Sequence, residues 1–166
     1  MLGEKFQCSF KVKTDQSDHL TVVKFLAEQV SHHPSVTAIY IECKEKRLKL
    51  NGSIRIKSEY LGMSISVQFV GDLILKSDKY NEEYKITLPT YFTRSIVTKP
   101  WSELGGICSI NCVSSGCSAT LEFILKSFYG EKSNQISVLV KNKNNDVICK
   151  ITGEWNARLE YEYVSS

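Results

Sequence analysis

The chain of 166 residues is 42% hydrophobic and 23% charged, and its 21 basic and 18 acidic side chains give a formal net charge of +3. This length and composition indicate one globular domain with a core of its own. The weak positive charge is dispersed along the chain, which argues against a nucleic-acid-binding surface. The start, Met1–Phe6, begins no apolar run of signal-peptide length, and no later segment approaches the ~18 apolar residues of a spanning helix. We therefore expect a protein that is neither secreted nor membrane-spanning.

Apolar and polar residues alternate along most of the chain, and this period of two predicts β-strands. The first strand is expected over Phe6–Val12. The segment Leu20–Val30 is the nearest candidate for a helix, but its Val22, Val23 and Phe25 suit a strand equally well. Further strands are expected at Val36–Cys43, Leu48–Ile56, Met63–Phe69, Tyr84–Leu88, Ile107–Val113, Ala119–Leu125, Ile136–Val140 and Val147–Ile151.

Polar turn residues separate several of these segments. Asn51-Gly52 is a turn signal that interrupts one apolar run, and Ser114–Gly116 and Asn142–Asp146 indicate hairpin turns between later strands. No internal repeat, low-complexity tract or interdomain linker is evident. The pattern predicts a single all-β domain built of antiparallel strands, and it does not choose between a sandwich and a barrel.

The six cysteines are expected to be reduced, because no secretory signal places the chain in an oxidising compartment. Cys108, Cys112 and Cys117 are close enough in sequence to raise the question of a metal site. Zinc sites usually show paired Cys-x-x-Cys spacing and a second ligand pair, and this sequence shows neither. We therefore expect buried core thiols, with no disulfide and no zinc.

The segment Glu28–Ser35 concentrates polar and titratable groups between two apolar strands, and it holds His32 and His33. Adjacent residues of a regular strand point to opposite faces, so a shared ligand requires a bend, which Pro34 favours. Two imidazoles at a bend can donate several N–H groups to one anion. The alternative interpretation is an ordinary surface turn or a satisfied core feature.

An enzyme is the rival class of function. Either histidine could act as a general base beside Ser31 or Asp18, which are near in sequence. However, the sequence has no Gly-x-Ser-x-Gly elbow, no phosphate-binding glycine loop and no His-Glu pair of a zinc hydrolase. We expect neither catalytic activity nor a cofactor.

The seven residues Glu28–Pro34, Glu-Gln-Val-Ser-His-His-Pro, resemble the signature of the oxysterol-binding protein family, and only Ser35 departs from it, at a position where the family usually has a second proline. Weaker matches to the family follow in the right order and cover nearly the whole chain. They are Leu2–Glu4, Lys49–Lys57, Thr98–Trp101 with Gly105-Gly106, Phe128–Lys132 and Gly153–Trp155.

The resemblance implies a curved antiparallel sheet or partial β-barrel around an apolar tunnel. It also implies non-vesicular lipid transfer, in which sterol or phosphatidylserine is exchanged for phosphatidylinositol 4-phosphate at membrane contact sites. His32 and His33 would then contact the inositol phosphate. The protein would be cytoplasmic and peripheral at membranes, with lipids as its ligands and no nucleic acid partner.

Compared with the family, residues 1–166 correspond to the core portion of the lipid-binding domain, without its N-terminal lid and C-terminal segment. We expect either a piece of a longer protein or a reduced relative. In the second case a phosphoinositide-sensing or scaffold module without transfer activity is the alternative function. The segment Lys99–Trp101 could be a membrane-touching loop, since Trp and Lys suit an interface, although a packed Trp is the commoner explanation.

Overall fold

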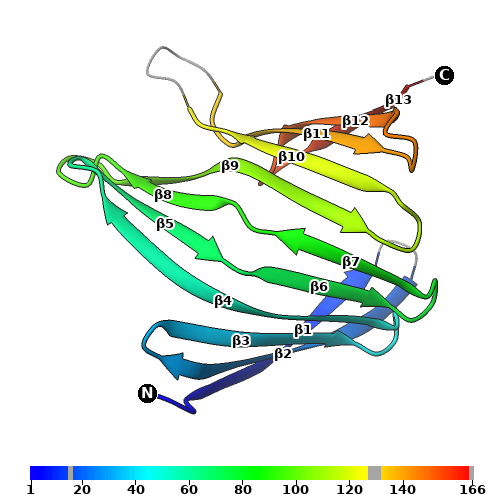
Figure 1. Ribbon diagram of the computed structural model, residues 1–166, viewed down its shortest axis with the longest axis horizontal. Helices are drawn as coiled ribbons and strands as arrows, with labels where there is room; N and C mark the ends of the chain where they lie inside the picture. Colours follow the sequence, from blue (N-terminus) through cyan, green and yellow to red (C-terminus); the bar gives the residue numbers. More distant parts are fainter. Residues whose placement is uncertain (15–16, 127–131, 165–166) are drawn as a thin grey trace.

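The computed structural model describes residues 1–14, 17–126 and 132–164 of the chain (Figure 1). Within these ranges the chain forms thirteen strands and no helix. None of the described segments is therefore a helix long and apolar enough to cross a bilayer. The strands are β1 (Lys5–Thr14), β2 (Ser17–His32), β3 (Ser35–Cys43), β4 (Leu48–Tyr60), β5 (Ser64–Val70), β6 (Asp72–Ser77), β7 (Glu82–Thr87), β8 (Thr90–Arg94), β9 (Trp101–Cys112), β10 (Ser118–Ile124), β11 (Gln135–Lys141), β12 (Val147–Glu154) and β13 (Leu159–Tyr163).

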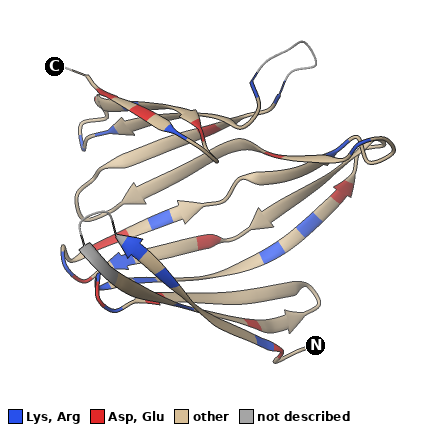
Figure 2. Ribbon diagram, turned by 180° about the vertical axis from the view of Figure 1, so that it is seen from behind, with Lys and Arg blue, Asp and Glu red and all other residues tan. Residues whose placement is uncertain are grey.

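All thirteen strands belong to one antiparallel sheet. Its main order is β1-β2-β3-β4-β5-β8-β9-β10-β11-β12-β13, and β6 and β7 lie between β4 and β9. The long strand β4 pairs with β6 along its first half and with β5 along its second half. The sheet curves, so that part of β1 and β2 passes behind the central strands in Figure 1 and in front of them in Figure 2.

Apolar residues that pair across neighbouring strands form rows on one face of the sheet. Because side chains alternate between faces, residues paired across neighbouring strands share a face. One row from β1 to β9 consists of Cys8, Phe25, Ile41, Leu50, Leu75, Tyr84 and Cys112. A second row from β9 to β13 consists of Cys108, Leu121, Val138, Ile151 and Tyr161.

The opposite face of β2 to β7 carries a charged row. Its members pair across five strands, and Lys76 lies 2.8 Å from Glu83 as an exposed ion pair. Figure 2 shows basic and acidic residues interspersed over the strands and turns. The row consists of Lys24, Glu42, Lys49, Lys76 and Glu83.

The core is small and the apolar face stays open at both edges of the sheet. Among the residues whose burial is described, six hydrophobic ones are buried, and four of these are the cysteines Cys43, Cys108, Cys112 and Cys149. At the β1 edge Phe10 is 53% exposed. Toward the other edge the side chains of β13 are exposed as well. The sheet therefore presents apolar surface that a larger apolar ligand or a further packed layer can cover.

The period of two predicted the fold class correctly, and Leu20–Val30 belongs to strand β2. The hairpin turns at 114–116 and 142–146 are also confirmed. The turn predicted at Asn51-Gly52 is wrong, because both residues lie inside β4. Gly52 has another role there: a Cβ at this position would lie 2.4 Å from the backbone oxygen of Asp72, so glycine permits the close approach of β6.

Candidate functional site

The two histidines lie at the turn that joins β2 to β3. His32 ends β2, His33 and Pro34 form the turn, and Ser35 begins β3. The His33–Pro34 peptide is cis. The imidazole centroids are 4.4 Å apart with the ring planes tilted by 49°, and both residues are exposed. The structure thus brings together the pair that a regular strand would direct to opposite faces.

The side chain of Gln29 holds this turn in place. Its Nε2 donates hydrogen bonds to the backbone oxygen of Ser31 at 2.5 Å and to Oγ of Ser35 at 2.8 Å. Its Oε1 accepts a hydrogen bond from Oγ1 of Thr37 at 3.1 Å. The β2–β3 register shifts between Gln29 and Ser31, so the strand bulges just before the histidines. Sequence reasoning missed this role, for which the signal was an amide side chain four residues before the turn at His33 and Pro34.

The backbone of Gln29 is also fixed by the residues that precede β1. Its N–H donates to the oxygen of Glu4 at 2.9 Å, and its oxygen accepts the N–H of Gly3 at 2.8 Å. The matched segment Leu2–Glu4 is therefore part of the support of the histidine turn. Because the turn is held from two sides, the imidazoles are presented to solvent on a fixed backbone.

A fixed, exposed pair of imidazoles is suited to binding an anion. Each neutral imidazole has one N–H donor, and each protonated imidazole has two, so a phosphate that contacts the edges of both rings can accept several hydrogen bonds. Hydrogen bonds with an ionised partner are shorter and stronger than neutral ones. The turn therefore has the chemistry of a phosphate site.

An apolar cavity of about 320 Å³ lies on the apolar face, near the other ends of β2 and β3. Its lining comes from β1, β2, β3, β4, β6 and the β3–β4 turn, and Lys46 is its charged member. About 20 Å of β3 separates it from the histidine turn, at ~3.3 Å per residue from Ser35 to Ile41. The lining residues are Val12, Thr21, Val23, Ile41, Cys43, Lys46, Leu48, Leu50 and Leu75.

The cysteines contribute packing and hydrogen bonding. Cys108 and Cys112 are each 3% exposed, as expected of core thiols, whereas Cys117 is half-buried. The Sγ of Cys112 lies 3.2 Å from Oγ of Ser114, and this hydrogen bond lowers the pKa of the Cys112 thiol. Burial raises the pKa of the Cys108 thiol. Among the residues that the structure describes, no three His, Cys, Asp or Glu side chains are grouped as metal ligands would be.

The fold and the site together describe an antiparallel β-sheet with an apolar cavity on one face and a turn that exposes two imidazoles at one end. The chain belongs to the oxysterol-binding protein family, because the family's model, described as Oxysterol-binding protein, matches residues 1–166. This confirms the resemblance drawn from Glu28–Pro34. Of the weaker matches, Phe128–Lys132 lies almost wholly in 127–131, outside the described residues.

Two curated relatives illustrate the similarity. Oxysterol-binding protein-related protein 10 of Homo sapiens is 41% identical over 186 residues, covering 98% of this chain and 24% of that protein. Oxysterol-binding protein-related protein 11 of Mus musculus is 47% identical over 192 residues, covering 98% of this chain and 26% of that protein. The chain thus spans about a quarter of the length of these relatives.

Solved structures confirm the fold. The Osh1 ORD domain in complex with ergosterol superposes with a TM-score of 0.81 at 22% identity, covering 99% of this chain and 37% of that one. The Osh3 ORD of Saccharomyces cerevisiae in complex with PI(4)P superposes with a TM-score of 0.76 at 20% identity, covering 95% of this chain and 40% of that one. The curved antiparallel sheet is therefore the sheet found in ORD domains.

Proposed function

We propose that this chain binds lipid and takes part in non-vesicular lipid transfer, with His32 and His33 holding the phosphate of phosphatidylinositol 4-phosphate. The observation that carries the proposal is the geometry of the turn: two exposed imidazoles 4.4 Å apart, on a backbone that Gln29 fixes at the end of an apolar face. Osh3, which superposes on this chain, was solved with PI(4)P, and this supports the choice of headgroup.

The distance from the turn to the apolar cavity suits a lipid. Half of a ~30 Å bilayer core, ~15 Å, is the span of one leaflet's acyl chains. A tail of ~15 Å would cover most of the ~20 Å between Ser35 and Ile41, so it would lie along the apolar face with its end toward the cavity. The headgroup would bind where water is available, and the tail would cover apolar side chains, each of which gains ~25 cal/mol per Å² removed from water.

The second ligand of the exchange is proposed to be sterol or phosphatidylserine. Osh1, solved with ergosterol, has the same sheet, and the cavity of about 320 Å³ falls within the range of small-molecule sites. Sterol and acyl chain would compete for one apolar face, which is the requirement of an exchanger.

The remaining expectations belong to the same proposal. Residues 1–166 form one domain, the core portion of an oxysterol-binding-protein-related lipid-binding domain. The protein acts in the cytoplasm as a peripheral protein at membranes, without nucleic acid partners. It is not an enzyme, so it returns its lipid chemically unchanged.

Lipid extraction is the experiment that tests this proposal. The chain is mixed with sedimentable vesicles that contain labelled phosphatidylinositol 4-phosphate, and the vesicles are removed by centrifugation. A carrier brings labelled lipid into the supernatant in proportion to protein. If the protein binds the vesicles but all the labelled lipid stays in them, the sensing or scaffold function takes the place of transfer in the proposal. If the protein neither binds the vesicles nor extracts lipid from them, the proposal as a whole is contradicted.

A further inference from the structure

Two turns lie side by side at one end of the sheet, on the left in Figure 1. One joins β4 to β5 after Tyr60, and the other joins β8 to β9 after Arg94. Ser64 pairs with Arg94, and the N–H of Ile96 donates to the oxygen of Met63 at 3.1 Å, so the two turns form one unit. We refer to residues 60–63 and 95–100 as the paired turns.

The paired turns carry apolar side chains into solvent. Tyr60 is 69% exposed, Leu61 48%, Met63 59% and Val97 74%. Surface turns are normally built from Gly, Pro, Asn, Asp and Ser, so four large apolar residues at two adjacent turns form an unusual surface. A contiguous exposed apolar surface marks a place where a partner or a membrane binds.

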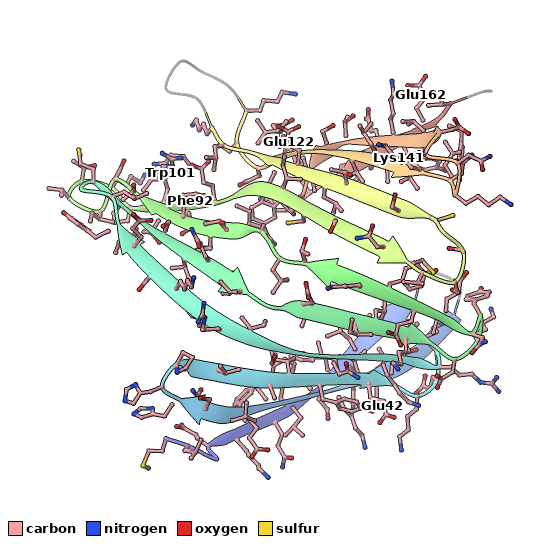
Figure 3. The ribbon with its side chains drawn as sticks, in the orientation of Figure 1. Glu42, Phe92, Trp101, Glu122, Lys141 and Glu162 are labelled. Atoms are coloured by element: carbon pink, nitrogen blue, oxygen red, sulfur yellow. The ribbon has the colours of Figure 1, made fainter. Side chains whose placement is uncertain are left out.

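Basic side chains border this apolar surface. A pocket of about 430 Å³ is lined by Arg94, Lys126 and Trp101 together with Leu61, Met63, Ser64 and Ser95. The Nζ of Lys126 lies 5.8 Å from the centroid of the Trp101 ring, and Figure 3 places Trp101 at this end of the molecule. Lys99 is exposed in the β8–β9 turn.

Among the residues that the structure describes, the acidic groups near the paired turns are Glu59 and Glu103. Glu103 is 2% exposed, its Oε1 is hydrogen-bonded to Nε of Arg94, and its Oε2 accepts the backbone N–H of Lys126 at 2.9 Å. Glu103 therefore lies beneath the pocket, where it orients Arg94, and Glu59 at the end of β4 is the exposed acid. The solvent side of the pocket is left positive.

The opposite end of the sheet differs in its apolar content. Lys44, Lys46, Arg47 and Lys79 lie in the β3–β4 and β6–β7 turns there. In the described turns of that end, the exposed apolar residues Tyr80, at 65%, and Val113, at 89%, are single ones in different turns, and further exposed apolar residues such as Val12 and Tyr163 lie on strands. Basic residues thus occur at both ends, with Glu45 and Asp78 beside them at the opposite end, whereas the paired turns combine basic residues with apolar side chains clustered in two adjacent turns.

We propose that the paired turns are a membrane-docking surface, in which Leu61, Met63 and Val97 enter an anionic bilayer while Arg94, Lys99 and Lys126 contact lipid phosphates. The chemistry of the surface matches an interface, with apolar tips, a Trp at mid-depth and basic groups behind them. The occupant is the lipid surface itself, and no phosphoinositide is needed. The inference rests on the peripheral membrane contact of the proposed function and names the surface that makes it.

The sheet register places the histidine turn close to the docked membrane. Val36 pairs with Arg55, so Pro34 is level with Lys57, three residues before Tyr60 on β4. At ~3.3 Å per residue, the paired turns project ~10 Å beyond the histidine turn. Insertion of the tips to ~5–10 Å would hold His32 and His33 at the level of the lipid headgroups.

Vesicle binding tests the surface without involving the histidines. The chain is sedimented with vesicles of phosphatidylcholine alone and with vesicles that contain about one third phosphatidylserine, both free of phosphoinositide. We expect binding to the anionic vesicles that weakens with salt. Leu61→Ser, Met63→Ser and Val97→Ser combined should lower the partition coefficient at least about tenfold, and Lys126→Ala about fivefold.

The matched control carries Tyr80→Ser, Val113→Ser and Lys79→Ala at the opposite end, and its partition coefficient should stay within about twofold of the parent. All substituted positions are exposed, and circular dichroism with gel filtration checks that each variant keeps the parent's fold and size. A variant with His32→Ala and His33→Ala should still bind these vesicles, which separates this inference from the proposed function.

Three results would overturn the inference. They are equal binding to both vesicle types, an equal loss in the opposite-end control, and a parent that forms dimers which the paired-turn variant dissociates. The last result would assign the surface to a second copy of the chain.

Discussion

Removal of the positive partner of Glu103 is expected to destabilise the fold by about 2–3 kcal/mol. Glu103 is 2% exposed, whereas the side chain of Arg94 is 25% exposed. Breaking a buried ion pair from one side typically costs about 3–5 kcal/mol, because the remaining charge stays buried without compensation. The partial exposure of Arg94 and the hydrogen bond that Lys126 N–H keeps to Glu103 place the expected cost of Arg94→Met below that range.

Urea unfolding monitored by circular dichroism measures this cost. The double variant with Arg94→Met and Glu103→Gln should recover more than half of the loss, because it no longer buries an unpaired charge. Lys76→Met is the matched control: it breaks a pair with Glu83 of similar kind, with both side chains about half exposed, and should cost under about 1 kcal/mol. The reasoning is refuted if Arg94→Met costs no more than Lys76→Met.

Three further outcomes follow from single contacts. Gly52→Ala should lower the free energy of unfolding in urea by about 1–3 kcal/mol, because the added Cβ would meet the backbone of Asp72. The control Ser53→Ala, on the same strand, should change it by no more than about 0.5 kcal/mol, and equal effects of the two variants would contradict the close approach. The hydrogen bond to Glu82 is the main cause that raises the pKa of Tyr84 to about 12, so the stability it gives is present below pH 10 and lost as pH rises from about 10 to 12. Glu82→Gln should bring this pKa down toward 10 in an absorbance titration of tyrosinate. If the highest tyrosine pKa in the titration stays the same, the assignment is contradicted. Thiol titration of the unfolded, unreduced protein should count six, and a lower count would reveal a disulfide.

The fold class was predictable because burial on one face of a sheet leaves a period of two in the sequence. That signal identifies strands with one dry and one wet face, and it failed where the pattern was short. The sequence pattern did not predict strands β8 and β13, which the structure shows at Thr90–Arg94 and Leu159–Tyr163. Asn51-Gly52 gave a local turn signal, which the pairing of β4 with β3 and β6 overrides.

The histidine pair was found in the sequence because its chemistry is local: two titratable rings lie beside a proline in one short motif. The ion pair of Arg94 with Glu103 was not found, since its partners meet only through the register between β8 and β9. A period of two along one strand does not specify which residues of a neighbouring strand it pairs with. The paired turns were found only in part: Lys99–Trp101 was a candidate membrane-touching loop, but residues 60–63 lie beside it only through the register between β5 and β8.

The central claim is that His32 and His33 bind the phosphate of phosphatidylinositol 4-phosphate. Calorimetry with soluble short-chain phosphatidylinositol 4-phosphate and with short-chain phosphatidylinositol tests it without a bilayer. The parent should prefer the phosphorylated lipid, and His32→Ala with His33→Ala should weaken that binding at least about tenfold, since charge-assisted hydrogen bonds contribute ~1.5–3 kcal/mol each. His19→Ala, which replaces the third histidine near the start of β2, serves as control and should bind as the parent does. Equal affinities of the double alanine variant and the parent for phosphatidylinositol 4-phosphate would contradict the account.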